Sequence, residues 1–384
     1  MQLDTLFIHG GIDGDEQTGA VNVPVYLTST YKQDGIGNHR GYEYSRTGNP
    51  TRFAVEELIK DLEGGSNGLA FASGMAAITA VLMLFRAGDK ILLSANVYGG
   101  TFRVLDKIFL NFGLNYELVD TSDLSLLTSK IDDSVKAIFI ETPTNPLMEV
   151  TDIAAISKIA KQKNILTIID NTFMTPYLQR PLELGADIVL HSATKYLGGH
   201  SDLIAGLVVV KDSALAQRLY FIQNATGGVL APFDSWLLIR GMKTLGVRMD
   251  RHLANSQSII QFLANNSAIK KIYYPGYNSA QQLQIQNNQA SGLGAILSFE
   301  LDSAYDVNIF LTSLKLITLA ESLGGIESLI SHPASMTHAA IPVHIRHQLG
   351  ISDRLIRLSV GIESVDDLIN DIQVALNIAR IHND

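Results

Sequence analysis

The feature that most constrains this fold is a series of short apolar runs that lack polar alternation. Two of them are IFI at 138–140 and ILTII at 165–169. A strand with one solvated face alternates apolar and polar residues, whereas a continuously apolar strand is typical of a parallel sheet with helices on both faces. Amphipathic stretches such as Ile153–Lys163 separate the runs. The pattern predicts an α/β fold with a large, mainly parallel sheet.

The predicted strands are spread over the middle of the chain. They are Leu69–Ala72, Lys90–Leu93, Asn115–Val119, Ala137–Glu141, Ile165–Asp170, Ile188–His191 and Leu203–Val210. Ligands of open α/β sheets bind at the carboxyl ends of the strands. The polar residues that follow these runs are therefore the candidates for a functional site.

The chain has 384 residues, enough for two or three domains. Residues 1–48 are rich in Gly, Thr and Tyr and show little periodicity, which predicts an arm that lies on another surface. Residues 49–240 form the predicted α/β domain, and residues 241–384 a smaller C-terminal α+β domain. A long helix is expected over 233–263, broken near Gly241 and Gly246.

Composition excludes several classes of protein. Lys and Arg number 29 against 38 Asp and Glu, a net charge of −9 that argues against a nucleic-acid-binding surface. The absence of cysteine excludes disulfides and thiolate chemistry. No HExxH motif is present, so no metal site is expected, and no apolar run approaches the roughly 20 residues that span a bilayer. The N-terminus lacks the features of a signal peptide, so we expect a cytoplasmic protein without a membrane partner.

Lys195 is the central candidate. It lies in HSATKYLGGHSD at 191–202, directly after a buried strand and beside Ser192 and Thr194. A lysine held against apolar strand ends loses solvation, which lowers its pKa and makes the amine nucleophilic. The neighbouring hydroxyls could bind an anion. The alternative is a solvated lysine in a glycine-rich turn.

Two further motifs also follow predicted strands. Asp170 ends the run ILTIID, where its carboxylate could pair with a buried cation or simply form a turn with Asn171. In FASGMAAI, a Ser73-Gly74 turn leads into a helix whose first amides favour an anion such as phosphate. An ordinary serine N-cap is the alternative.

Aromatic and cationic candidates come from two glycine-containing segments. Tyr98 in NVYGGTFR could stack on a flat ligand or could be a packing residue. GYEYSRTGNPT offers Glu43, Tyr44 and Arg46, of which Tyr44 and Arg46 could donate to a phosphate. A plain surface loop is the alternative for this segment.

The remaining candidates lie after or within later apolar runs. Asn145 follows a predicted strand in ETPTNP, and Arg357 lies within the apolar run RLIRLSV. An inward arginine there needs an anionic partner such as a substrate carboxylate, whereas an outward one would be solvated. Glu321 and Ser322 precede a glycine pair in AESLGG, where an ordinary polar turn is the alternative.

The set as a whole fits pyridoxal phosphate holding an amino-acid substrate. It offers a lysine for an imine, an aspartate for a ring nitrogen, a stacking tyrosine and groups for a phosphate and a carboxylate. A nicotinamide-dependent oxidoreductase is disfavoured because no GxGxxG fingerprint is present. A non-catalytic α/β binding protein is the alternative from another class.

The motifs YSRTGNPT, FASGMAAI, VYGGT, ETPTNP, IIDNTF, HSATKYLGGHSD, AESLGG and RLSVGIE occur in this order along the chain. In them the sequence resembles the Cys/Met-metabolism family of pyridoxal-phosphate enzymes, of fold type I. The resemblance implies that Lys195 forms the imine, Asp170 pairs with the pyridine nitrogen and Tyr98 stacks on the ring. The residues that it implies for the phosphate are the amides of Gly74 and Met75 and the hydroxyls of Ser192 and Thr194.

The resemblance also implies partners and substrate contacts. Tyr44 and Arg46 would reach the phosphate of a neighbouring subunit, within a homotetramer made of two catalytic dimers. Asn145, Ser322 and Arg357 would surround the α-carboxylate of the amino acid.

Within the family, the chain is most similar to bacterial cystathionine γ-lyases. Glu321 matches the γ-lyases and γ-synthases, and Glu43, Arg103 and Glu321 resemble the set that contacts the distal end of cystathionine. The implied reaction is α,γ-elimination of cystathionine to cysteine, 2-oxobutanoate and ammonia. Cystathionine γ-synthase or O-acetylhomoserine thiolyase activity, and a β-lyase side activity, remain open.

Overall fold

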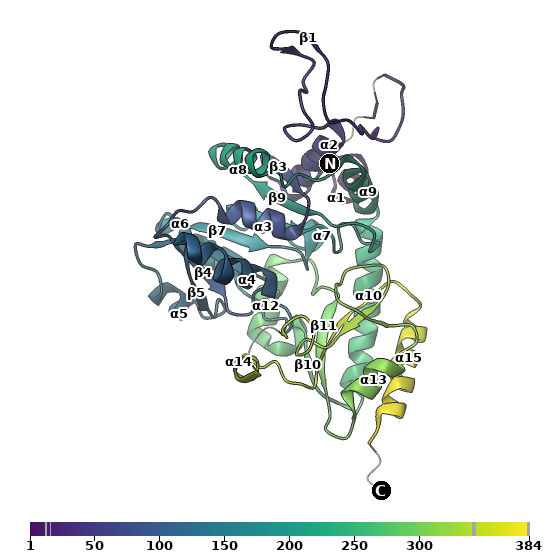
Figure 1. Ribbon diagram of the computed structural model, residues 1–384. Coiled ribbons are helices and arrows are strands. Elements are labelled where there is room, and N and C mark those ends of the chain that lie inside the picture. Colours follow the sequence, from purple (N-terminus) through teal and green to yellow (C-terminus); the bar gives the residue numbers. More distant parts are fainter. Residues whose placement is uncertain (12–13, 16, 340–342, 382–384) are drawn as a thin grey trace.

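Two β-sheets organise the computed structural model, which describes residues 1–11, 14–15, 17–339 and 343–381. A seven-stranded sheet comes from the first part of the chain and a five-stranded sheet from the C-terminal part (Figure 1). Among the described residues, no helix combines the length and the apolar character needed to cross a membrane.

The large sheet is mainly parallel, as predicted. Its strands, in spatial order, are β3 (Asn67–Phe71), β9 (Gly206–Val210), β8 (Ile188–Ser192), β7 (Leu166–Asp170), β6 (Val135–Glu141), β4 (Lys90–Ser94) and β5 (Asn115–Val119). The strands from β8 to β5 pair in parallel, and β9 runs antiparallel to both β3 and β8. The carboxyl ends of the parallel strands therefore meet at one edge.

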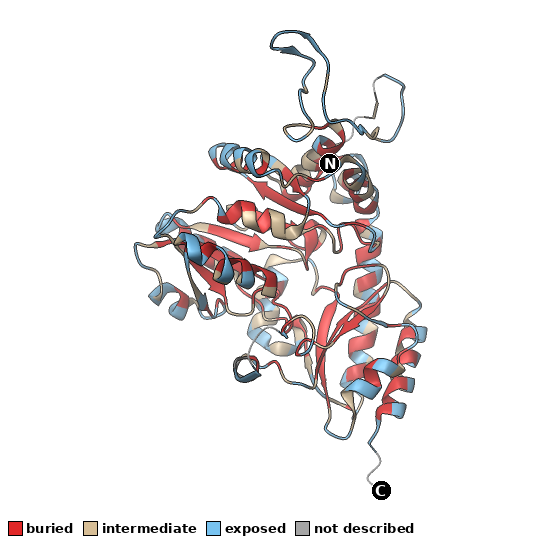
Figure 2. Ribbon diagram, in the orientation of Figure 1, coloured by how far each residue is buried: buried red, intermediate tan, exposed pale blue. Residues whose placement is uncertain are grey.

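Helices cover both faces of this sheet, which explains the lack of polar alternation. In β6, Phe139 packs into the core on one face, while Ile138 and Ile140 pack into the core on the other. Apart from the edge strand β5, the strands are buried at their central residues (Figure 2). The helices of this part are α2 (Pro50–Glu63), α3 (Gly74–Leu82), α4 (Gly99–Lys107), the 3-10 helix η1 (Phe109–Phe112), α5 (Leu124–Ser129), α6 (Ile153–Gln162), α7 (Thr175–Leu178) and α8 (Ser213–Thr226).

The order of the strands creates a crevice between β4 and β6. The chain continues from β4 to β5 on one side, whereas from β6 it continues to β7 on the other side. Connections that diverge in this way leave a gap at the carboxyl ends of the two strands, where α/β proteins bind their ligands. Tyr98 follows β4 and Glu141 ends β6, so both border this gap.

The smaller sheet is mainly antiparallel. Its strands, in spatial order, are β10 (Ile269–Tyr273), β11 (Ile296–Leu301), β14 (Leu355–Ser359), β13 (Leu329–Ser331) and β12 (Thr318–Leu319). The helices after the large sheet are α9 (Pro232–Met242), which packs in the core beside the large sheet, and α10 (Leu245–Ala264), α11 (Pro275–Asn278), α12 (Ala280–Gln289), α13 (Val307–Ser313), α14 (Val343–Gln348) and α15 (Val365–Ala379).

Helix α10 joins the two halves of the molecule. Leu245 and Met249, in its first turns, pack into the core beside the large sheet. Ile259 and Leu263, near its end, pack into the core of the smaller sheet. One helix therefore fixes the orientation of the two sheets through side chains buried at both of its ends.

The long helix predicted over 233–263 is broken between Met242 and Leu245, near Gly241 and Gly246 as expected, and Gly246 itself lies inside the first turn of α10. A Cβ on Gly246 would lie 3.0 Å from Asp4 Oδ1 and 3.3 Å from the ring of Tyr177, so the glycine makes room for close packing.

The first 48 residues contain one helix that the sequence analysis missed. Helix α1 (Leu3–His9) buries Phe7 in the core beside the large sheet. One short helix with a single anchoring side chain leaves little periodicity to detect. Beyond it, β1 (Gln33–Gly35) and β2 (Asn38–His39) form an exposed hairpin that extends away from the body of the molecule (Figure 1).

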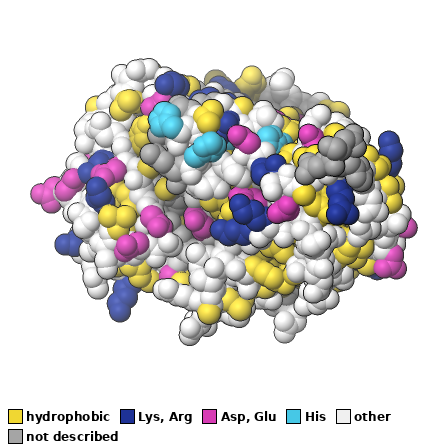
Figure 3. All heavy atoms as spheres, turned by 90° about the horizontal axis from the view of Figure 1, so that it is seen from below, with side chains coloured by type: hydrophobic (Ala, Val, Ile, Leu, Met, Phe, Trp, Pro, Cys, Tyr) yellow, Lys and Arg dark blue, Asp and Glu magenta, His cyan; other side chains and the backbone are white. Residues whose placement is uncertain are grey.

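Acidic and basic side chains intermingle on the face seen from below (Figure 3). On this face neither sign forms a continuous field among the residues drawn in colour. Such a mixture is ordinary for a protein whose net charge is −9.

Candidate active site

A cavity of about 270 Å³ lies at the carboxyl ends of the central strands, between the two sheets. Most of the predicted site residues line it. They are Gly74, Met75, Tyr98, Asn145, Asp170, Ser192, Thr194, Lys195, Glu321, Ser322 and Arg357. Segments separated by almost 300 residues therefore converge on one space.

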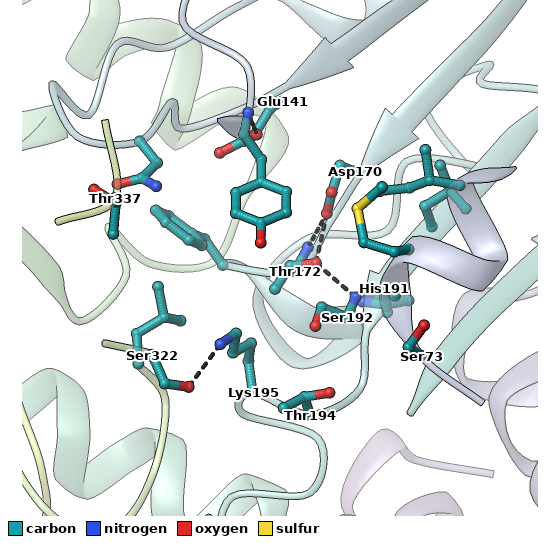
Figure 4. A pocket seen from close by; sticks show the side chains of 18 of the residues that line it. Ser73, Glu141, Asp170, Thr172, His191, Ser192, Thr194, Lys195, Ser322 and Thr337 are labelled. Carbon is teal, nitrogen blue, oxygen red and sulfur yellow. Dashed lines mark hydrogen bonds between the residues drawn. The ribbon is translucent and has the colours of Figure 1, made fainter. Parts of the chain in front are cut away.

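The Lys195 amine is held inside this cavity rather than in solvent. The lysine lies in a turn after β8, in which its backbone N–H donates to Ser192 O at 3.1 Å. Its Nζ donates to Ser322 Oγ at 2.6 Å (Figure 4). The pKa of Lys195 is lowered to about 8, mainly by burial and also by the charge of Arg357, while Glu321 opposes both. An unprotonated, nucleophilic amine is therefore accessible near neutral pH.

The loop that supplies Ser322 is strained and tightly packed. Ser322 has φ +95°, in a region that few residues other than glycine adopt. Gly324 has φ +76°, and a Cβ there would lie 2.7 Å from Tyr196 N. The glycine therefore lets this loop lie against the lysine loop, and backbone strain of this kind is concentrated at functional sites.

Arg248 stabilises the other side of the lysine loop, a role the sequence analysis did not detect. This α10 side chain is 3% exposed. Its guanidinium donates to Tyr196 O at 2.7 Å and to Gly241 O at 2.8 Å. Only the tertiary structure brings these carbonyl groups to it, because helical periodicity reveals that a residue is buried but not which groups it will contact.

Asp170 is oriented by its own turn. Thr172 donates to Asp170 Oδ1 through its backbone N–H at 3.1 Å and its hydroxyl at 2.5 Å. The Thr172 hydroxyl in turn accepts from Ser192 N at 2.8 Å. Burial raises the pKa of Asp170, while the Thr172 hydrogen bonds and the charge of His191 lower it. None of the described residues donates to the other oxygen, Oδ2, which is left for a ligand.

Two more acidic groups near Asp170 were also missed. Glu141 lines the cavity, and its Oε2 accepts from Tyr98 N at 2.8 Å. His191 Nε2 lies 2.6 Å from Glu63 Oε1, and both side chains are buried. Glu141 could have been predicted from its position at the end of a continuously apolar strand. Glu63 could not, because it lies on a helix far away in the sequence.

The start of α3 forms a cradle for a small anion. Ser73 caps the helix by accepting from Ala76 N at 3.0 Å, and no described residue accepts from the amides of Gly74 and Met75. A Cβ on Gly74 would lie 3.0 Å from Ser192 Cβ, so only glycine leaves this space open. Gly206 supports the turn, because a Cβ there would lie 2.1 Å from Ser73 O.

Thr194 makes a different contact from the one expected. Its hydroxyl accepts a hydrogen bond from Ala205 N at 3.0 Å and donates one to Ala205 O at 3.2 Å. No hydrogen bond from Ser192 Oγ to a described residue is present, so its hydroxyl is the freer of the two. A phosphate role for either hydroxyl remains a prediction.

Arg357 points inward from β14 and is 3% exposed. Its Nη1 donates to Asn145 Oδ1 at 3.0 Å, and its Nη2 donates to Ser322 O at 2.9 Å. Burial lowers the pKa of Arg357 to about 10, opposed by Glu141. The guanidinium thus remains cationic at neutral pH, close enough to Lys195 to lower the pKa of its amine.

Four predicted residues do not line the cavity of this single chain. Glu43, Tyr44 and Arg46 lie on the exposed N-terminal segment, where the Arg46 guanidinium is 5.5 Å from the centre of the Tyr44 ring. Arg46 Nη1 also donates to Asn224 Oδ1 at 3.1 Å. Arg103 is an exposed residue of α4. Their roles remain predictions.

Comparisons with known proteins agree with this geometry. The family model for Cys/Met metabolism PLP-dependent enzymes matches residues 4–377. The chain belongs to this family. A cystathionine β-lyase of Lactococcus lactis subsp. cremoris is 57% identical over 374 residues, covering 97% of this chain and 98% of that protein. A cystathionine γ-lyase of Bacillus subtilis is 56% identical over 376 residues, covering 98% and 99%.

A solved structure is equally similar to this one. The cystathionine γ-lyase from Lactobacillus plantarum, complexed with L-serine, has a TM-score of 0.97 and 54% identity and covers 99% of each chain. The likeness covers both sheets and the cavity between them, so the family's fold is that of the whole chain.

The cofactor of this family is pyridoxal phosphate, and the cavity suits it. The open space at Gly74 and the free amides of α3 suit a phosphate, and the Lys195 amine, with its lowered pKa, suits an aldehyde. The unpaired Oδ2 of Asp170 suits a protonated ring nitrogen. The observed donors and acceptors therefore fit the group at each of its polar positions.

The lowered pKa of Lys195 predicts how cofactor loading depends on pH. Below about pH 8 the amine is protonated and cannot attack an aldehyde, so the loading rate should rise through pH 8 and then level off. The measurement is the rate at which the visible absorbance band appears when pyridoxal phosphate is added to apoenzyme. Lys195→Ala is the control and should show no such band. A rate that keeps rising to about pH 10.5 would mean that Lys195 is solvated like a free lysine.

Proposed function

We propose that this trans-sulfuration enzyme is a cystathionine γ-lyase, which converts L-cystathionine to L-cysteine, 2-oxobutanoate and ammonia. The observation that supports this best is the position of Glu321. It borders both the Lys195 cavity and an adjoining hollow that is open to solvent. A carboxylate there suits the distal ammonium group of cystathionine, whose other end would lie at Lys195.

The proposal assigns binding and orientation to residues from both sheets. Arg357 would hold the α-carboxylate of the substrate, with Asn145 keeping the guanidinium in place through its 3.0 Å hydrogen bond. The Ser322 hydroxyl accepts a hydrogen bond from Lys195 Nζ. Ser322 would have to release the amine before Lys195 acts as a base. These contacts would place the substrate Cα beside the amine.

Lys195 would then move protons between neighbouring atoms of the substrate. The amine would take the proton from Cα and, in the γ-reaction, would deliver it to the imine carbon; neutral again, it could then take a proton from Cβ before the Cγ–S bond breaks. The bound pyridoxal phosphate supplies an electron sink that stabilises negative charge at Cα. Asp170, with Thr172 orienting its carboxylate, would keep the ring nitrogen protonated. Cysteine leaves as the thiol, and water releases 2-oxobutanoate and ammonia.

Two related activities are the principal alternatives. A β-lyase would break the Cβ–S bond and form pyruvate and homocysteine, and a γ-synthase or O-acetylhomoserine thiolyase would run γ-replacement on an activated homoserine. The similarity to both β-lyases and γ-lyases at nearly equal identity leaves these open. A cytoplasmic location likewise remains a prediction.

Product analysis of the purified holoenzyme tests the assignment directly. With L-cystathionine as the substrate, we expect 2-oxobutanoate and cysteine to exceed pyruvate and homocysteine. Parallel reactions contain homocysteine alone, or O-acetylhomoserine plus cysteine. A predominance of pyruvate would identify a β-lyase, and efficient formation of cystathionine from the second mixture would identify a synthase.

Glu321 should favour γ- over β-elimination. Its carboxylate would set the depth of the substrate by attracting the distal ammonium, so Glu321→Ala should lower the ratio of 2-oxobutanoate to pyruvate. A loss of about 1 kcal/mol, roughly fivefold in the ratio, is expected for a half-exposed ion pair. Asp202→Ala is the matched control, because this exposed acid borders only the outer hollow. An unchanged ratio in Glu321→Ala would remove the main support for the γ-lyase assignment.

We further propose that the enzyme is a homotetramer of two catalytic dimers, in which Tyr44 and Arg46 complete the site of a neighbouring subunit. Both residues are exposed and lie outside the cavity of their own chain. Mixing inactive Arg46→Ala with inactive Lys195→Ala protein should restore part of the activity, because some re-formed dimers would contain one intact site. Absence of recovery, despite demonstrated subunit exchange, would place each site within a single chain.

A further inference from the structure

Glu141 is a buried carboxyl group for which the proposed mechanism has no use. It ends β6, is 5% exposed and lines the cavity. Its Oε2 accepts a 2.8 Å hydrogen bond from the backbone N–H of Tyr98, the residue directly before α4. This hydrogen bond thus spans the crevice between β4 and β6, at the point where the strand connections diverge.

A second buried carboxyl group lies on the neighbouring strand. Glu141 and Asp170 are paired residues in the parallel register of β6 and β7, so their side chains leave the sheet on the same face. Both side chains line the cavity (Figure 4), and neither forms an ion pair with a described residue. Two like charges this close in a buried site cannot both be ionised without a large cost.

We propose that Glu141 is a positioning residue that remains a neutral carboxylic acid, fixing Tyr98 in place while Asp170 alone carries the negative charge opposite the cofactor ring. The proposal rests on the pyridoxal-phosphate site described above. It does not depend on which sulfur amino acid is the substrate.

The surroundings decide which of the two groups keeps the proton. Thr172 donates two hydrogen bonds to Asp170 Oδ1, one of them from its hydroxyl, whereas Glu141 has backbone donors alone, the amide of Tyr98 and, with a smaller effect on its pKa, that of Asn145. His191 on β8 also favours the charged form of Asp170. Burial raises the pKa of Glu141 well above its usual range, and the charge of Asp170 raises it further. The Thr172 hydroxyl and the charge of His191, which have no counterpart at Glu141, thus favour the charged form of Asp170.

The remaining charged groups around Glu141 do not reverse this order. Arg357 on β14 favours ionisation of Glu141, but its effect is smaller than those of burial and of Asp170. The Arg357 guanidinium donates to Asn145 Oδ1 and Ser322 O rather than to Glu141. His338 lies beside Arg357, and burial lowers its pKa to about 4, so it is neutral at pH 7.

A neutral acid in this position has two physical advantages. It accepts the Tyr98 N–H, which would otherwise be an unpaired donor at the start of α4. It does so without adding a second negative charge beside Asp170. An ionised Glu141 would compete for the ring-nitrogen proton and would raise the pKa of any amine or imine in the cavity.

The test compares two substitutions of Glu141 in the full-length enzyme. In Glu141→Gln the amide oxygen can still accept from Tyr98, and no charge is lost if the native group is neutral. In Glu141→Ala this acceptor is missing. The matched control is Glu149→Gln, a partly buried carboxyl group after the same strand that accepts from Asn96 and does not line the cavity. The readouts, taken for apoenzyme titrated with pyridoxal phosphate, are the dissociation constant at pH 7 and the pH midpoint of the visible band.

The expected results distinguish the positioning of Tyr98 by Glu141 from an effect of a charge on Glu141. Glu141→Gln and the control should bind the cofactor within about twofold of wild type, with an unchanged pH midpoint, because the Tyr98 hydrogen bond and the local charge are retained. Glu141→Ala should bind it about tenfold more weakly, the cost of leaving one backbone N–H unpaired. Far-ultraviolet circular dichroism of each apoenzyme checks that the variants are folded.

Two results would overturn the proposal. If Glu141→Gln is as weak as Glu141→Ala, or moves the pH midpoint by about one unit, Glu141 is ionised in the native enzyme. If Glu141→Ala binds the cofactor as tightly as wild type, the residue does not position Tyr98. Neither result depends on the products formed from cystathionine, so the γ-lyase assignment can fail while this proposal stands.

Discussion

The interaction on which this site depends is the hydrogen bond between Lys195 and Ser322, because it joins the two halves of the molecule. The lysine follows a strand of the large sheet, and the serine lies in the loop between β12 and β13 of the smaller sheet. The amine is buried at this junction, and burial is the main reason for its lowered pKa. The nucleophilicity of Lys195 is thus a consequence of how the sheets pack, and α10 maintains that packing through its two buried ends.

Close backbone approach is the second constraint, and glycine makes it possible. At Gly206, Gly241 and Gly324 an added Cβ would lie 2.1, 2.3 and 2.7 Å from a backbone atom of another segment. These contacts bring the α3 turn, α9 and the Ser322 loop against the turns that surround the cavity. A side chain at any of these positions would separate segments that must act together.

The predictions made from the sequence are most accurate where local pattern and global fold agree. The large parallel sheet was predicted because its strands are continuously apolar in the sequence. The site residues were predicted because they directly follow these apolar runs. Arg248, Glu63 and Thr172 were missed, because their importance lies in the groups that they contact. The break in the long helix was predicted near Gly241 and Gly246 and lies between them, and the packing role of Gly246 inside α10 was visible only in the structure.

The sequence by itself determined the family, the cofactor and the order of the strands and helices, because each is encoded in residue types at short spacings. The tertiary structure alone decided how these residues act on one another. It placed Glu141 beside Asp170, turned Arg357 inward toward Asn145, and left Tyr44 and Arg46 outside the cavity of their own chain. The physical reason is that burial and charge coupling depend on distances between segments far apart in the chain, and a one-dimensional pattern does not contain those distances.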